Sequence, residues 1–97
     1  MAGPAKLPPD EARQRVGALK GWTLDGDTIR KEYAFGSFRE AVSFVVRLAF
    51  EAEAADHHPD VTISYRKVTL VYSTHSAGGL TGKDFEGATA ADRIAWV

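Results

Sequence analysis

The sequence predicts a two-layer α+β domain, in which a four-stranded antiparallel sheet carries three helices on one face. Helical and strand-like patterns follow one another in the order α-β-β-α-β-β-α, and short turns join the consecutive strands. Strands joined by short turns pair antiparallel, and helices with one apolar stripe pack on a sheet face. A chain of 97 residues has room for one hydrophobic core, so we expect residues 1–97 to form a single domain.

The first helix is predicted to begin near Pro8, and we expect residues 1–7 to be frayed. Pro8-Pro9-Asp10-Glu11 suits a helix start, because proline is tolerated in a first turn and acidic side chains favour the positive end of the helix dipole. Apolar residues then recur at helical spacing, at Ala12, Val16 and Leu19. Lys20-Gly21 supplies a stop signal.

A first hairpin is predicted after this helix. Trp22–Leu24 is a strand candidate, and Asp25-Gly26-Asp27 is a turn signal of the hairpin kind. The second strand places apolar residues on one side of a period-2 pattern, at Ile29, Tyr33 and Phe35. Lys31 interrupts the apolar side, so we expect this strand to be partly exposed.

The middle helix has the strongest pattern in the chain. Ser37-Phe38-Arg39-Glu40 is a capping box, with Ser37 as cap and Glu40 reaching back to it. An apolar stripe follows at Phe38, Ala41, Val42, Val45, Leu48, Ala49 and Ala52, and it is broadened by Phe44, Val46 and Phe50. Such a helix is either the spine of the core or also part of a subunit interface. It must end near Asp56, because Pro59 disfavours helical geometry at the residue before it.

A second hairpin and a last helix complete the predicted fold. Val61–Tyr65 and Val68–Thr74 are its strands, Arg66-Lys67 is its turn, and Tyr65 and Tyr72 are expected to be packing residues. After the loop Ala77-Gly78-Gly79, Thr81 to Asp84 form the cap of the last helix. Its apolar stripe consists of Phe85, Ala88, Ala91, Ile94 and Ala95.

Composition excludes several classes of function. The absence of cysteine excludes disulfides, thiolate catalysis and cysteine-ligated zinc. A net charge of -1 gives no reason to expect nucleic acid or an anionic membrane as a partner. The first residues contain no apolar signal-peptide region, and no apolar run is long enough to span a membrane. We expect a cytoplasmic protein.

All three histidines lie between residues 57 and 75. The residues just before and just after a hairpin lie at the same end of it, so His57 or His58 can converge with His75. Glu53 is one helical turn before His57, and Asp84, at the third position of the last helix, can approach the same place.

Imidazoles beside carboxylates suit general acid–base chemistry, because one ring can donate a proton while another accepts one. No cysteine and no serine elbow motif offers a nucleophile, so proton transfer is the natural hypothesis. Two alternatives stay open at this point. The histidines can be ordinary surface residues with Asp84 serving only as a helix cap, or two histidines and a carboxylate can hold zinc or iron.

The motif residues, taken together, resemble those of the pterin-4a-carbinolamine dehydratases. They are Glu53-x-x-x-His57-His58-Pro59, Tyr65, Ser73-Thr74-His75 and Gly79-Leu80-Thr81-x-x-Asp84-Phe85, with Gly21-Trp22 and the helix carrying Phe38, Ala41 and Phe44 in support. The resemblance extends from about Leu7 to Val97. Arg66 departs from it, because asparagine is common at that place in the family.

The resemblance implies dehydration of a 4a-hydroxytetrahydropterin to the quinonoid dihydropterin. It implies that His57 and His75 are the catalytic acid and base, and that His58 binds or orients the hydroxyl and the pterin. Glu53 and Asp84 are then supporting carboxylates. Backbone groups of three further residues pair with the pterin edge, namely Ser73, Thr74 and Ser76.

The resemblance also implies that no metal and no organic cofactor is needed, since the substrate is itself a spent cofactor. It implies a homodimer or homotetramer, and an aromatic amino acid hydroxylase as the source of the substrate. Some relatives act as protein-binding modules, namely a transcriptional coactivator and assembly factors for large enzyme complexes. The intact set of three histidines favours an enzyme over such a module.

Overall fold

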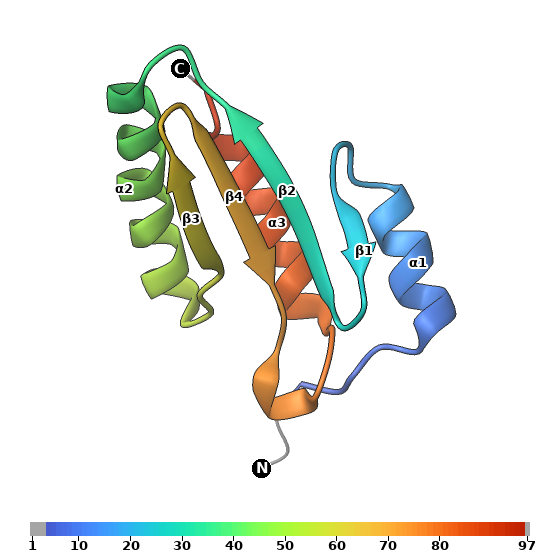
Figure 1. Ribbon diagram of the computed structural model, residues 1–97. Helices are drawn as coiled ribbons and strands as arrows, with labels where there is room; N and C mark the ends of the chain where they lie inside the picture. Colours follow the sequence, from blue (N-terminus) through green and yellow to red (C-terminus); the bar gives the residue numbers. More distant parts are fainter. Residues whose placement is uncertain (1–3, 97) are drawn as a thin grey trace.

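The computed structural model describes residues 4–96, and it confirms the predicted α+β architecture. The elements follow in the predicted order, as Figure 1 shows. They are α1 (Pro9–Gly17), β1 (Thr23–Asp25), β2 (Thr28–Ala34), α2 (Phe38–Ala55), β3 (Asp60–Ser64), β4 (Lys67–Tyr72), the short 3-10 helix η1 (His75–Ala77) and α3 (Gly82–Ile94).

The four strands form one antiparallel sheet in the order β1-β2-β4-β3. β4 is therefore a central strand, with Tyr72 opposite Ile29 of β2 and Val71 opposite Asp60 of β3. The strand β3 forms one edge of the sheet, and α2 runs beside it (Figure 1). This topology places the end of β4, where His75 follows, near the start of β3, where His57 and His58 precede.

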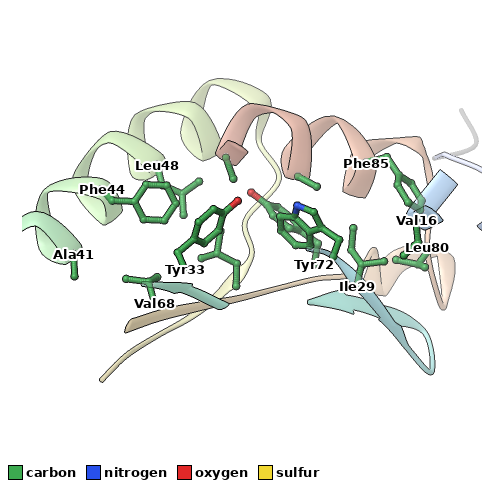
Figure 2. Close-up of a cluster of buried hydrophobic side chains, with 14 of the residues drawn as sticks. Val16, Ile29, Tyr33, Ala41, Phe44, Leu48, Val68, Tyr72, Leu80 and Phe85 are labelled. Carbon is green, nitrogen blue, oxygen red and sulfur yellow. The ribbon is translucent and has the colours of Figure 1, made fainter. Parts of the chain in front are cut away.

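One hydrophobic core lies between the sheet and the helices (Figure 2). β4 contributes every second residue to it, namely Val68, Leu70 and Tyr72. The helices contribute Val16 from α1, Phe44 and Leu48 from α2, and Phe85, Ala88 and Ala91 from α3. Because all three helices pack into this one core, they lie on the same side of the sheet.

Both hairpins differ from the sequence prediction by one or two residues, and β4 ends at Tyr72 rather than at the predicted Thr74. β1 begins at Thr23, and Trp22 before it is buried in the core. In the second hairpin Ser64 pairs with Lys67, so the turn is Tyr65-Arg66 and the predicted turn at Arg66-Lys67 was wrong. Tyr65 has a left-handed backbone with φ of 52° and is 68% exposed, so it is not a packing residue.

Lys31 points toward the helices despite its charge. Its ammonium group donates to Asp92 of α3 at 2.9 Å and to the carbonyl oxygen of Lys20 at 3.0 Å. Asp92 also accepts hydrogen bonds from the indole of Trp22 and the hydroxyl of Tyr33. Burial and this carboxylate raise the pKa of Tyr33, so its hydroxyl stays a donor. The strand is partly exposed, as expected, but the break in the apolar pattern at Lys31 marks an ion pair on the helix side of the sheet.

The helix α2 begins as predicted, but its cap differs in one detail. Ser37 accepts from the N–H of Glu40, whereas the Glu40 carboxylate accepts from Gly36 rather than from Ser37. The core face of α2 consists of Ala41, Phe44, Leu48 and Ala52, so Phe38 and Ala49 of the predicted stripe lie outside it.

The chain before α1 is tied to the core at Leu7, within the segment expected to be frayed. The Leu7 N–H donates to the carbonyl oxygen of Leu80 at 2.8 Å, and its side chain packs against the core. Residues 1–3 lie outside the described part. Within residues 4–96, no helix combines the length and the apolar composition that crossing a bilayer requires.

Tyr72 and Gly87 make the closest approach between the sheet and α3. A Cβ atom on Gly87 would lie 2.5 Å from Cε1 and 2.8 Å from Cζ of the Tyr72 ring. Real Cβ atoms essentially never come this close. Glycine at position 87 therefore makes room for a tyrosine on the central strand.

We predict that Gly87→Ala changes the free energy of unfolding with opposite sign in two backgrounds. In the native chain, overpacking against Tyr72 costs about 1–3 kcal/mol and outweighs the gain of about 1 kcal/mol from replacing a helical glycine. In a Tyr72→Leu background the ring is absent, so only the gain remains. Urea unfolding of the four proteins measures both effects. Destabilisation in both backgrounds would contradict this account.

Candidate functional site

The end of α2 sets the direction of the two adjacent histidines. The helix ends at Ala55, and Asp56 adopts a left-handed conformation with φ of 50°. The N–H of His57 still donates to the carbonyl oxygen of Ala52 at 3.1 Å, which closes the helix end. Beyond this point the chain turns into β3, as Pro59 predicts.

His57 points inward and bonds a buried carboxylate. Its Nε2 lies 2.6 Å from Oδ1 of Asp84, and only 12% of its side chain is exposed. Asp84 itself is 0% exposed. It occupies the third position of α3, where the positive end of the helix dipole stabilises a negative charge.

Two threonines complete the surroundings of Asp84. Its Oδ2 accepts from the Thr74 hydroxyl at 2.8 Å and from the Thr81 N–H at 2.9 Å. The Thr81 hydroxyl lies 2.8 Å from that of Thr74 and accepts from the N–H of Lys83. The predicted cap at the start of α3 is confirmed; it is a capping box, and it also holds the partner of His57.

The hydrogen bonds around Asp84 determine which atom of each pair donates the proton. A carboxylate only accepts, so the proton between His57 and Asp84 belongs to Nε2 of the imidazole. Because Thr74 donates to Asp84, the Thr81 hydroxyl must donate to Thr74. The remaining ring nitrogen of His57, Nδ1, is therefore the atom that can exchange a proton with a ligand.

His58 and Glu53 form a second pair, at the surface. Nε2 of His58 bonds Oε2 of Glu53, and both side chains are largely exposed. The sequence spacing placed Glu53 on the face of His57, one helical turn away. The left-handed residue Asp56 breaks the helical register, so Glu53 reaches His58 while Asp84 reaches His57.

His75 lies in η1, directly after the strand end, and is exposed. It lines a shallow hollow of about 310 Å³ together with Ser73, Thr74 and the β1–β2 turn. Ser76 is exposed in the same 3-10 turn. The Thr74 N–H donates to the carbonyl oxygen of Gly79 and its carbonyl oxygen accepts from the Gly79 N–H, while its hydroxyl donates to Asp84.

A cavity of about 220 Å³ opens beside His57, between α2 and α3. Its lining residues are Glu51, Ala52, Ala55, His57, Tyr72, Lys83, Glu86, Gly87 and Ala90. The rings of His57 and Tyr72 are nearly parallel, with an angle of 18° and centroids 6.0 Å apart. His58 instead lines a third hollow with Pro59 and Val61. The three histidines thus line three different hollows at one end of the sheet.

Tyr72 lines this cavity, whereas the sequence analysis predicted only a packing role for it. Its position carried a signal, because it is the last inward residue of β4 and directly precedes the Ser73-Thr74-His75 motif. Burial, followed by the nearby Asp84 charge, raises its pKa to about 12, so the phenol is a neutral donor.

Among residues 4–96, no group of three or more histidine, aspartate or glutamate side chains is arranged to hold a metal ion.

We predict that the neutral imidazole of His57 is protonated at Nε2. Nitrogen NMR of labelled protein distinguishes the two tautomers. Asp84→Ala removes the acceptor, so the ring should then populate both tautomers. His58 should be unaffected by this substitution, because its partner is Glu53. A native His57 protonated at Nδ1 would contradict the proposed donor directions.

This chain is similar to known proteins over most of its length. The family model described as pterin 4 alpha carbinolamine dehydratase matches residues 5–94. A provisionally named pterin-4-alpha-carbinolamine dehydratase of Roseiflexus castenholzii is 57% identical over 87% of this chain and 90% of its own length. Its counterpart in Opitutus terrae is 50% identical over 97% of this chain and 98% of its own length.

Two solved structures described as pterin dehydratases or pterin dehydratase-like are similar in fold to this protein. The crystal structure of a transcriptional coactivator/pterin dehydratase from Brucella melitensis has a TM-score of 0.89 and 33% identity, covering 94% of this chain and 99% of that one. A pterin dehydratase-like protein identified as a RuBisCO assembly factor in the alpha-carboxysome has a TM-score of 0.63. It is 21% identical and covers 76% of this chain and 86% of that one, so it shows a shared fold alone. The chain belongs to the pterin-4-alpha-carbinolamine dehydratase family, whose named enzymes are hydro-lyases.

Proposed function

We propose that this protein dehydrates 4a-hydroxytetrahydropterins to quinonoid dihydropterins by histidine acid–base catalysis. One observation carries the proposal: the imidazole of His57 lines an open cavity while a fully buried carboxylate holds its Nε2. This arrangement fixes the ring and its tautomer, and it leaves Nδ1 as the nitrogen that exchanges a proton with the substrate. Family membership supplies the substrate class.

The reaction moves two protons. The C4a–O bond breaks as the leaving hydroxyl takes up a proton and departs as water, and N5 gives up its proton as the C4a–N5 double bond forms. One acid and one base suffice, and both are restored when the protons are exchanged with solvent. We assign these tasks to His57 and His75, which differ in surroundings: His57 is bonded to Asp84, whereas His75 is exposed.

The other site residues support this exchange. Asp84 and Glu53 are the carboxylates that orient His57 and His58, and His58 is the residue that orients the hydroxyl and the pterin. Ser73 and Ser76 flank His75 and offer backbone groups to the donor–acceptor edge of the pterin, while Thr74 holds Asp84. This chemistry uses no metal and no organic cofactor. Its substrate is the product of a pterin-dependent aromatic amino acid hydroxylase.

A second candidate function is protein binding. The outward side of α2 exposes Phe38, Val46 and Phe50, which are large apolar side chains on a helix surface. The Brucella melitensis structure, at 33% identity, is described as a transcriptional coactivator as well as a pterin dehydratase.

The same apolar side, together with the open edge strand β3, supports self-association into a homodimer or homotetramer.

We predict that His57→Ala and His75→Ala each lower turnover by about 100-fold or more, because each removes one partner of the proton exchange. An assay coupled to an aromatic amino acid hydroxylase measures the loss of the 4a-hydroxy species. Arg30→Ala, on the sheet face away from the helices, is the matched control and should retain full activity.

The outcomes of this assay separate the hypotheses. If the native protein does not accelerate the dehydration, the proposed function is refuted and protein binding becomes the better candidate. Native activity that survives both histidine substitutions would refute the assigned mechanism alone. Activity lost on prolonged chelation and restored by zinc or iron would favour the metal alternative.

We predict that the protein self-associates in solution. Light scattering after size exclusion should give at least twice the chain mass of 10.5 kDa. Phe50→Glu, which places a charge on the outward side of α2, should lower the mass if that side forms an interface. A monomeric native protein would contradict the prediction.

A further inference from the structure

The hydroxyl of Tyr72 has no hydrogen-bond partner among the described residues, although the residue is only 1% exposed. No fully buried polar side-chain atom in residues 4–96 lacks a partner, so this hydroxyl cannot be enclosed. It must meet open space, and the open space that Tyr72 lines is the cavity between α2 and α3. Buried hydroxyls normally find an acceptor, so an open one indicates that the acceptor comes from outside the chain.

Tyr33 provides the comparison within the same sheet. Both tyrosines stand on the helix side of neighbouring strands, and both rings extend toward the helices (Figure 2). The Tyr33 hydroxyl donates to Asp92, so that tyrosine is satisfied within the fold. Tyr72 has no such carboxylate, and Gly87 keeps the space above its ring clear of a side chain.

The rest of the cavity wall fits a flat, uncharged ligand. Its helical walls include the small residues Ala52, Ala55 and Ala90, which leave room for a ring. Charges of both signs surround the opening, with Lys83 against Glu51 and Glu86, and Glu51 is paired with Arg93. This mixture offers no net attraction to a phosphate or carboxylate.

We propose that this cavity is part of the pterin site and that the Tyr72 hydroxyl donates a hydrogen bond to an acceptor atom of the substrate. The acceptor is a carbonyl oxygen, a ring nitrogen or a hydroxyl oxygen of the pterin. His57 lies in the same wall, so a ligand bonded to Tyr72 is held beside the imidazole assigned to proton exchange. This inference rests on the proposed function, and it adds a substrate-binding residue to it.

The test compares Tyr72→Phe with Tyr33→Phe in binding and in stability. The binding probe is 7,8-dihydrobiopterin, a stable pterin, followed by calorimetric titration. Tyr72→Phe should raise its Kd about 3- to 10-fold, as expected for loss of one hydrogen bond, and leave the urea midpoint unchanged because no internal partner is lost. Tyr33→Phe should lower the urea midpoint and leave the Kd unchanged.

A second pair of variants tests the cavity without touching the tyrosine. Ala54 and Ala55 are neighbouring exposed residues of α2, but Ala55 lines the cavity. Ala55→Leu should narrow the cavity and raise the Kd at least threefold, whereas Ala54→Leu should not.

Native turnover, measured in parallel, separates this inference from the proposed function. A Kd unchanged by either Tyr72→Phe or Ala55→Leu in an active protein overturns the cavity assignment alone. A native protein that binds no pterin and shows no turnover overturns both. Binding that follows the predicted pattern without turnover supports the cavity and refutes the dehydratase.

Discussion

The geometry of the site depends on the hydrogen bonds of one buried carboxylate, that of Asp84. An ionised group without solvent is costly unless every lone pair that faces the protein finds a donor. Asp84 obtains donors from the α2–β3 loop through His57, from the end of β4 through Thr74, and from its own helix start through Thr81. One side chain therefore joins the α2–β3 loop to the end of β4 and to the start of α3. Moving any of them would remove one of the three donors that this buried carboxylate has.

A second carboxylate, Asp92, has the corresponding role at the other end of α3. A negative charge in the last turn of a helix is opposed by the helix dipole, so it needs a positive partner. Lys31 supplies that charge, and Trp22 and Tyr33 add hydrogen bonds from the sheet. The helix is thus held to the sheet by an acid at each end. Between them Gly87 lets the Tyr72 ring approach, which places the cavity at the middle of the helix.

Local patterns predicted the order of elements and both helix caps near the site, because hydrophobic periodicity and capping are properties of neighbouring residues. One error arises where a partner lies far away in sequence, and another at a turn whose residue types are unusual. Lys31 looked like a sign of exposure, since nothing nearby reveals an aspartate 61 residues later. Tyr65 in a left-handed turn is unexpected from its type, because glycine or asparagine usually adopts that conformation.

The same limit applies to the pairing of histidines and carboxylates. Spacing of four residues joins side chains only while the chain remains helical, and Asp56 ends the helix between Glu53 and His57. Adjacent histidines consequently enter different surroundings, one against a buried acid and one against an exposed acid, while His75 lies on the exposed 3-10 turn. Identical side chains are thus held differently, because only the Nε2 of His57 bonds a fully buried carboxylate. A dehydration needs such a difference, since one group must give a proton while another receives one.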